Sequence, residues 1–139
     1  MKSILRFRTT FALLALLFGS FAFVSMTSLH INDWVVPAAY KTKANPQAGK
    51  ADPDNVGKGL YKLHCKSCHG AEGFGDGDKA STLKTKMNDF TAAVFTKQTD
   101  GEIYYKSYIG REEMPNFEKK IKSETDRWLL VNYIRKLAK

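Results

Sequence analysis

The sequence predicts an all-α domain in which long loops join three main helices, preceded by an N-terminal signal or transmembrane helix. Apolar residues recur at helical spacing in three segments, and two of these segments open with capping-box motifs. No strand of any length is convincing in the Gly- and Lys-rich stretch from residue 70 to 97. Of the 139 residues, 43% are hydrophobic and 26% are charged, which excludes wholesale disorder and low-complexity structure.

The N-terminal segment has the pattern of an export signal. Lys2, Arg6 and Arg8 form a basic head, and residues 9–29 carry no charge. As a helix this run would reach about 30 Å, enough to cross a bilayer, and the basic head keeps its own end in the cytoplasm. We expect residues 1–30 to be a retained transmembrane anchor or a cleaved signal; a buried core helix is the third interpretation. An anchor or a signal would both export the rest of the chain.

The next segment is expected to be a tether. Residues 31–51 contain prolines and scattered lysines without a sustained helical or strand period, so we predict an extended linker. Trp34 and Tyr40 would suit the membrane–water interface or a place on the domain that follows, and the sequence does not decide between them. The compact domain is then predicted to be residues 52–139.

The first helix of this domain is predicted to begin with Asp52 as its cap and Pro53 at the first helical position. Val56, Leu60 and Leu63 then recur at helical spacing as far as the cysteines. A helix is therefore expected directly before the cysteine motif.

The two later helices carry clearer start signals. Thr99 and Glu102 form a capping box before an apolar segment that Gly110 ends. Ser123 begins a second box, with Asp in the Glu position, before a helix from residue 127 to about 136. One face of this last helix has apolar residues at i, i+3, i+4 and i+7: Leu130, Tyr133, Ile134 and Leu137.

The central motif is a C-x-x-C-H run, Cys65-Lys66-Ser67-Cys68-His69, which is the attachment pattern of c-type haem. Two thiols on one helical turn reach the two vinyl groups at the edge of a haem, and His69 then lies under the ring and can donate a nitrogen to the iron. A redox dithiol would need a βαβ context, a zinc site would need four ligands, and a plain disulfide would leave His69 and the long loops unexplained. We therefore expect one covalent haem c, bound through Cys65 and Cys68, with His69 as an axial ligand of the iron.

The sixth ligand of the iron has three candidates. Met114 precedes Pro115 in the loop between the two later helices, and proline fixes φ and removes an N–H, so this loop can hold the thioether. Met87 lies among lysines in the mid-chain loop without such support. His64 directly precedes Cys65 and is tied to the side of the attachment turn. We expect Met114 to be the axial ligand.

Taken together, these residues resemble a bacterial class I monohaem cytochrome c domain over residues 52–139. The resemblance is carried by the attachment motif, the glycine-rich run from His69 to Gly77, the Met114–Pro115 pair and the C-terminal segment from Leu130 to Arg135. It implies a class I cytochrome c-like fold with long loops around one haem, in which the first and last helices cross beside the haem. It also implies that Gly57 permits the close crossing and that three residues pack there: Tyr61, Leu130 and Tyr133.

The sequence departs from the family pattern at one point. Relatives often carry a proline soon after the motif, whose carbonyl accepts the N–H of the proximal imidazole. No proline occurs between Gly70 and Pro115 in this chain. A carbonyl near Asp78 is the remaining candidate, so the hydrogen-bond partner of His69 stays open.

The resemblance implies an electron carrier and not an enzyme. With His69 and Met114 both on the iron, oxygen or peroxide cannot bind unless Met114 leaves, and the soft sulfur favours the reduced ion. The alternative is a haem enzyme, or a gas or peroxide sensor, whose sixth site is open or labile. A small subunit anchored in a larger respiratory complex is a further possibility.

The net charge of +8 is compatible with docking to an acidic protein partner. Because the charge is scattered and the domain is exported, nucleic acid is not an expected partner. The expected partners are redox proteins such as a quinol-oxidising complex or a terminal oxidase, and the membrane through the N-terminal helix. The expected location is the cytoplasmic membrane with the haem domain on the periplasmic side, or the periplasm if the signal is cleaved. Five lysines either line the docking edge or form an ordinary solvated surface: Lys58, Lys62, Lys66, Lys84 and Lys86.

Overall fold

Every regular element that the structure describes is helical. The structure, a computed structural model, describes residues 34–139, and no β-strand occurs among them. The three longest helices are α3 (Val56–His64), α6 (Asp100–Ile109) and α7 (Glu124–Leu137). The prediction of an all-α domain with three main helices and long loops is confirmed for this part of the chain. The short helical segments are α2 (Ala38–Lys41), α4 (Lys66–His69), η1 (Ala80–Thr82) and α5 (Ala93–Thr96).

The predicted signal or transmembrane helix, residues 1–30, lies outside the described residues. Within residues 34–139, no helix is both long enough and apolar enough to cross a bilayer. The membrane anchor and the cleaved signal therefore both stay predictions.

Asp52 caps α3, although the helix does not begin where the sequence suggested. The Asp52 carboxylate accepts the backbone N–H groups of Val56 and Gly57, each at 2.9 Å. Asn55, directly before Val56, has φ 53°, a left-handed conformation that asparagine tolerates better than most residues. The predicted start at Pro53 is wrong, because the chain must turn before Val56 for Asp52 to reach two amide groups of the first helical turn.

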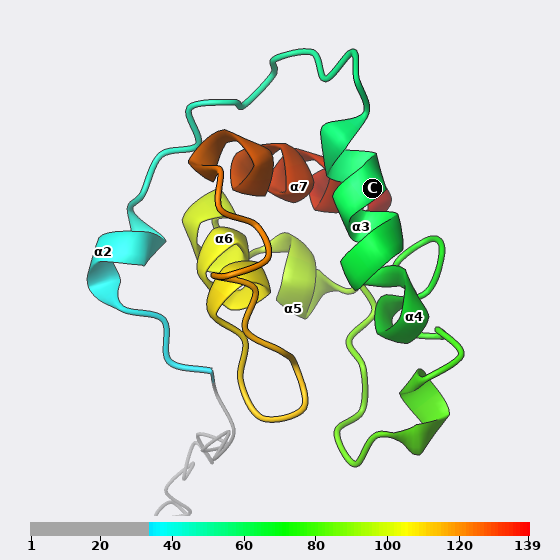
Figure 1. Cartoon of the computed structure of the whole chain (residues 1–139). Helices are drawn as coiled ribbons and strands as arrows, with labels where there is room; N and C mark the ends of the chain where they lie inside the picture. The colour runs from blue at the N-terminus through cyan, green and yellow to red at the C-terminus, as the bar shows by residue number, and fades with distance from the viewer. Residues whose placement is uncertain (1–33) are drawn as a thin grey trace, which may run out of the picture. The chain divides into compact units, whose positions relative to one another are not determined.

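Helices α3 and α7 cross in close contact at Gly57 (Figure 1). A Cβ atom at Gly57 would lie 2.6 Å from the carbonyl carbon of Leu129, so only glycine lets the two backbones approach this closely. Tyr61 packs beside the crossing with its ring centroid 5.3 Å from that of Tyr133. Leu130 is buried in the same core. The expected crossing and its packing residues are confirmed.

The capping box predicted at the start of α6 is complete, whereas at the start of α7 only the Ser123 half of the predicted box is present. Thr99 Oγ1 accepts the N–H of Glu102 at 3.2 Å, and the Glu102 carboxylate accepts the N–H of Thr99 at 2.8 Å. Gly110 follows the last residue of α6 with φ 71°. Ser123 Oγ accepts the N–H of Asp126 at 3.2 Å, and α7 begins directly after Ser123 rather than at residue 127.

The core lies between α3, α6 and α7 and continues into the loops that carry Phe90 and Phe117. Trp128 is 0% exposed, with its ring centroid 4.2 Å from that of Tyr104 on α6. Trp128 carries no periodic sequence signal for this core position, because it lies outside the i, i+3, i+4, i+7 series on α7. The buried apolar cluster consists of Tyr61, Cys65, Phe90, Phe95, Ile103, Tyr104, Phe117, Ile121, Trp128, Leu130, Val131 and Ile134.

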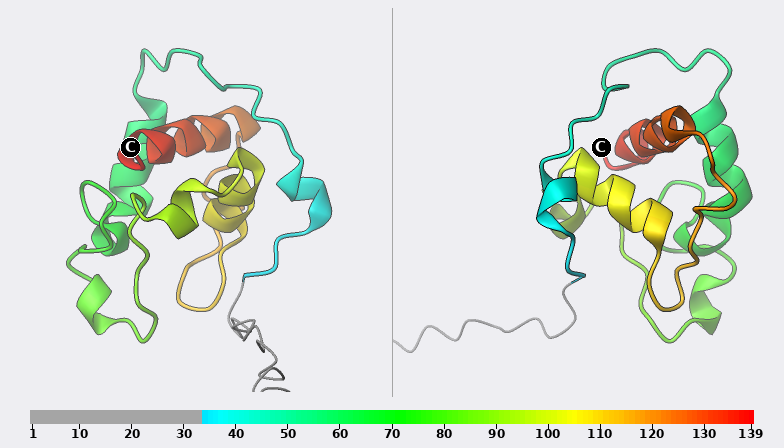
Figure 2. Two further views of the ribbon diagram at one scale, coloured as in Figure 1. Left: turned by 180° about the vertical axis from the view of Figure 1, so that it is seen from behind. Right: turned by 60° about the vertical axis from the view of Figure 1, so that its left-hand side comes forward.

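Residues 34–51, called the N-terminal strap below, pack on the helices. Helix α2 lies beside α6 (Figures 1 and 2). The Tyr40 ring packs against the Tyr105 ring of α6 with a centroid distance of 4.8 Å. Farther along, Asn45 Nδ2 donates to Asp100 on α6 at 2.8 Å and to Asn132 on α7 at 2.9 Å. These contacts attach the strap to both helices.

The strap changes the expected domain boundary. The compact unit begins at Trp34 and not at residue 52, and the described part of the 31–51 segment is not an extended linker. Val36 is buried, and Trp34 and Tyr40 are partly buried, so both aromatic residues pack on the domain. The physical reason is side-chain pairing over long sequence distances, which leaves no periodic signal in the strap itself.

Gly101 is the point at which the strap lies closest to α6. A Cβ atom there would overlap the carbonyl oxygen of Tyr40 and lie 2.9 Å from that of Lys43. We expect Gly101→Ala to displace the strap and to lower the free energy of unfolding by about 1–3 kcal/mol, although alanine favours a helix. Chemical denaturation and limited proteolysis within residues 34–51 measure this, and an unchanged cleavage rate would contradict it.

Candidate haem-binding site

A cavity at the end of α3 brings together residues from four parts of the chain. Its empty space is about 790 Å³, which includes the open solvent at its mouth. The lining residues come from the strap, the cysteine motif, the mid-chain loop and the loop after α6: Trp34, His64, Cys65, Cys68, His69, Leu83, Thr85, Lys86, Met87, Asn88, Arg111, Glu112, Glu113, Met114, Pro115 and Phe117.

One wall of the cavity is the cysteine motif. Cys65 follows the last residue of α3, and α4 continues through Cys68 to His69, with the N–H of His69 donating to the Cys65 carbonyl at 2.9 Å. This single turn presents both thiols and the imidazole to one cavity. Neither cysteine is in a disulfide, and burial raises the pKa of the Cys65 thiol to about 12. Because catalytic redox dithiols need a lowered pKa, this environment argues against a thiol–disulfide enzyme.

His69 has an incomplete set of hydrogen bonds. Its Nδ1 atom is shielded from solvent and has no hydrogen-bond partner among residues 34–139, and burial lowers the pKa of the imidazole. The ring packs against Phe90 with a centroid distance of 5.0 Å. The open question about its partner therefore has an answer for the described residues: no carbonyl near Asp78 replaces the missing proline. A buried imidazole nitrogen without a hydrogen-bond partner is rare in proteins, so His69 Nδ1 lacks a group that the described residues do not supply.

Backbone contacts hold the loop after the motif close to α4. The N–H of Gly77 donates to the Cys68 carbonyl at 3.3 Å, and the N–H of Lys79 donates to the Ser67 carbonyl at 2.8 Å. A Cβ atom at Gly77 would lie 2.6 Å from the carbonyl oxygen of Lys66. The glycine-rich run is thus needed for the chain to fold back over the motif.

The two candidate methionines both line the cavity and are both partly buried. Met114 ends a tight hairpin in which its N–H and carbonyl pair with the carbonyl and N–H of Arg111, at 3.0 and 2.9 Å. Met87 lies in the irregular loop between η1 and α5. Two thioethers therefore line the cavity, and their positions in the wall do not by themselves identify which one would be the axial ligand.

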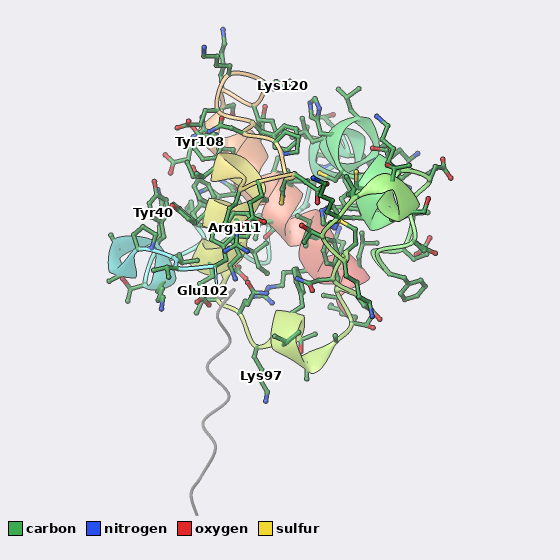
Figure 3. All side chains as sticks on the ribbon, turned by 90° about the horizontal axis from the view of Figure 1, so that it is seen from below. Tyr40, Lys97, Glu102, Tyr108, Arg111 and Lys120 are labelled. Atoms are coloured by element: carbon green, nitrogen blue, oxygen red, sulfur yellow. The ribbon has the colours of Figure 1, made fainter. Side chains whose placement is uncertain are left out.

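The sequence did not predict that Arg111 and Trp34 would meet in the cavity wall. The Arg111 guanidinium lies over the Trp34 ring, 5.0 Å from its centroid, and also 3.7 Å from the Glu112 carboxylate. In Figure 3 Arg111 lies near the middle of the face seen from below, while Tyr40 lies near its margin. Because Trp34 belongs to the strap and lines the cavity, the strap supplies one side chain to the cavity wall. No local signal marks Trp34 for this role, because its partner is far away in sequence.

His64, the third candidate ligand, lines the cavity from the end of α3. Its ring packs against Phe117 at a centroid distance of 5.3 Å. Burial, and to a lesser extent the charge of Lys120, lowers the pKa of His64. Of the five lysines considered for a docking edge, Lys86 lines the cavity, and the other four are exposed but do not line it.

These residues fit a covalently attached haem. Two free thiols on one turn, an imidazole with an orphaned nitrogen and a thioether face one cavity with an open mouth. Apolar side chains supply much of the remaining wall, including those of Leu83, Pro115 and Phe117. Among residues 34–139, no group of three or more His, Cys, Asp and Glu side chains is arranged to hold a bare metal ion. A macrocycle that brings its own four ligands therefore suits this donor set better than a zinc ion.

Comparison with known families gives an independent result. Residues 55–138 match the family model described as cytochrome c. The match begins one residue before α3 and ends within the last residues of the chain, so it includes the cysteine motif and the Met114 hairpin but not the strap. No curated protein matches the chain.

Proposed function

Because the chain belongs to the cytochrome c family, we propose that it is a one-electron carrier with a single haem, held by Cys65 and Cys68 and ligated by His69 and Met114. Family membership itself accounts for the covalent c-type haem and for haem-based electron transfer. The haem, when bound, supplies reversible one-electron oxidation of its iron. The protein's own residues must attach it, orient it and keep water away from it.

The observation that carries this proposal is the gathering of four donor atoms around one cavity. Cys65, Cys68 and His69 come from a single turn, whereas Met114 comes from a hairpin 45 residues beyond His69. A carrier needs both axial positions filled, because a filled site resists the binding of oxygen or peroxide. An imidazole and a thioether on one cavity meet that requirement.

Met114 is the better-held of the two thioethers. Two backbone hydrogen bonds close its hairpin, and Pro115 fixes the backbone that leaves it. A rigid loop loses less conformational entropy when its side chain binds a metal than an irregular one does. Met87, in the irregular loop, would have to order more of the chain on binding.

Shielding of the cavity supports electron transfer over substrate turnover. Phe117 is 4% exposed, and Phe90 behind His69 is 5% exposed, so the side of the cavity toward the core is dry. A dry, rigid surrounding favours fast one-electron exchange, because little has to rearrange when the charge changes. The open mouth is the natural place for a redox partner to approach.

We further propose that the carrier works outside the cytoplasmic membrane with partners of the respiratory chain. The basic and apolar N-terminal sequence supports export, and the excess of lysine and arginine supports docking to an acidic surface. A quinol-oxidising complex as donor and a terminal oxidase as acceptor fit this placement. Residues 1–30 would then be either a membrane anchor or a removed signal.

Replacing each methionine in turn tests the proposed ligation. We expect Met114→Ala to abolish the weak far-red absorption band that reports a methionine sulfur on ferric haem, and to lower the midpoint potential by ~100 mV or more, because axial ligands set haem potentials over about 0.8 V. Met87→Ala is the matched control and should keep the band. Absorption spectra and redox titration of the purified holoprotein measure both.

Two results would overturn the assignment. Loss of the band in Met87→Ala and not in Met114→Ala would make Met87 the ligand. A wild-type protein that lacks the band, shows a high-spin ferric spectrum and binds carbon monoxide readily would instead be a haem enzyme or a gas or peroxide sensor.

A further inference from the structure

The hairpin that carries Met114 is tied to a second loop by one side chain. Glu113 Oε1 accepts the backbone N–H of Lys84 at 3.0 Å, and its Oε2 accepts that of Thr85 at 2.7 Å. The two oxygens of this carboxylate therefore accept hydrogen bonds from two successive backbone amides. The contact joins positions 28 and 29 residues apart in the chain.

Both loops joined by Glu113 line the haem-binding cavity. Thr85 and Met87 contribute from one loop, and Arg111 and Met114 contribute from the other. Neither loop belongs to a long helix, so no regular hydrogen-bond ladder holds them together. The Glu113 carboxylate supplies a fixed distance between the two segments of the wall.

The hairpin needs such a tie because its own conformation is strained. Glu112 has φ 55°, a left-handed conformation that is unfavourable for a non-glycine residue. Gly110, two residues before Glu112, has φ 71°. A Cβ atom there would lie 2.5 Å from the carbonyl carbon of Pro115, so the close turn requires glycine at this position. A strained turn persists only when its surroundings hold it.

We propose that Glu113 is a positioning residue that clamps the Met114 hairpin against residues 84–85 and so keeps the thioether directed at the iron. This rests on the proposed function, in which Met114 is the axial ligand. Glu113 lines the same cavity, but both of its carboxylate oxygens accept the backbone amides of Lys84 and Thr85. Its effect is on how often the Met114 side of the cavity opens.

If Glu113 holds the hairpin, it should slow the displacement of the Met114 thioether from the iron by an added ligand. An added ligand such as imidazole can bind ferric iron only after the thioether has left, so its binding rate reports the opening of the hairpin. We expect Glu113→Ala to bind imidazole about tenfold faster than wild type, since two hydrogen bonds to a charged group are lost. Glu113→Gln keeps one accepting oxygen and should fall between the two. Stopped-flow absorption of the ferric holoprotein measures these rates.

Glu118→Gln is the matched control. Glu118 lies in the same connection between α6 and α7, is exposed and does not line the cavity, so this variant should bind imidazole within twofold of the wild-type rate. Hydrogen exchange provides a second measurement that does not depend on the haem chemistry. The amides of Lys84 and Thr85 should exchange about tenfold faster in Glu113→Ala and stay unchanged in Glu118→Gln.

The outcomes separate this inference from the proposed function. If wild type lacks the far-red band of methionine ligation, the proposed function fails and the inference fails with it. If the band is present but Glu113→Ala binds imidazole at the wild-type rate, only the clamp is wrong. Faster imidazole binding with an unchanged melting temperature supports the clamp, because general destabilisation would lower both. If Glu113→Ala does not fold, the same comparison is made with Glu113→Gln.

Discussion

Replacing both cysteines, Cys65→Ala with Cys68→Ala, should remove covalently attached haem completely. The two thioether bonds can form only from these thiols, because the chain has no other cysteine. Any haem that still enters the cavity would be held by axial ligands and apolar contacts, which are lost when the protein unfolds. Haem staining after denaturing electrophoresis and the intact mass of the protein measure the result.

The neighbouring Ser67→Ala is the matched control for this experiment. Ser67 lies between the cysteines and is exposed, so its loss leaves both thiols and the turn in place. We expect wild-type covalent haem in this variant. Single replacements should each retain one thioether and a lower yield of holoprotein. Covalent haem in the double variant would disprove the attachment site, and this readout is independent of any stability lost with the buried Cys65 side chain.

The substitution Gly57→Ala should strongly destabilise the domain. The added Cβ atom would overlap the carbonyl oxygen of Leu129 and lie 2.6 Å from the carbonyl carbon, and neither backbone can move aside without separating α3 from α7. We expect a loss of about 3 kcal/mol or more, at the upper end of what overpacking costs. In a domain of this size that corresponds to a melting temperature lower by roughly 12 °C or more.

Gly59→Ala on the same helix is the control for Gly57→Ala. A Cβ atom at Gly59 meets nothing within 4 Å, so alanine there should stabilise the protein by about 0.5–1 kcal/mol through its helix propensity. The two substitutions are chemically identical and two residues apart, with opposite expected signs. Thermal unfolding followed by circular dichroism measures both. A destabilisation in both variants would mean that the helix, and not the crossing, is sensitive to alanine.

The site could be predicted largely because its key residues are close together in sequence. Cys65, Cys68 and His69 fall on one turn, and the spacing needed to reach a haem from one turn is a local property of the chain. The capping box of Thr99 and Glu102 was predictable for the same reason, since the two residues satisfy each other's backbone amides within one helical turn. Such patterns can be recognised without knowing the rest of the fold.

The expectation of Met114 over Met87 depends on a weaker local signal, Pro115. Both lie in loops, and the structure brings both to the cavity wall. Their difference depends on how firmly each loop is held. The Arg111–Met114 hydrogen bonds favour Met114, and they have no sequence signature beyond Pro115.

The amino-acid sequence by itself determined the all-α class, the three main helices and the cysteine motif, because helical periodicity, capping and attachment spacing all act within a few residues. Only the tertiary structure decided that the strap packs on α6 and α7, that Trp34 enters the cavity wall and that His69 Nδ1 lacks a partner within residues 34–139. Asn45 meets Asp100 and Asn132 across 55 and 87 residues. Contacts over such distances depend on how the helices are stacked in space, and no local pattern of residues encodes that.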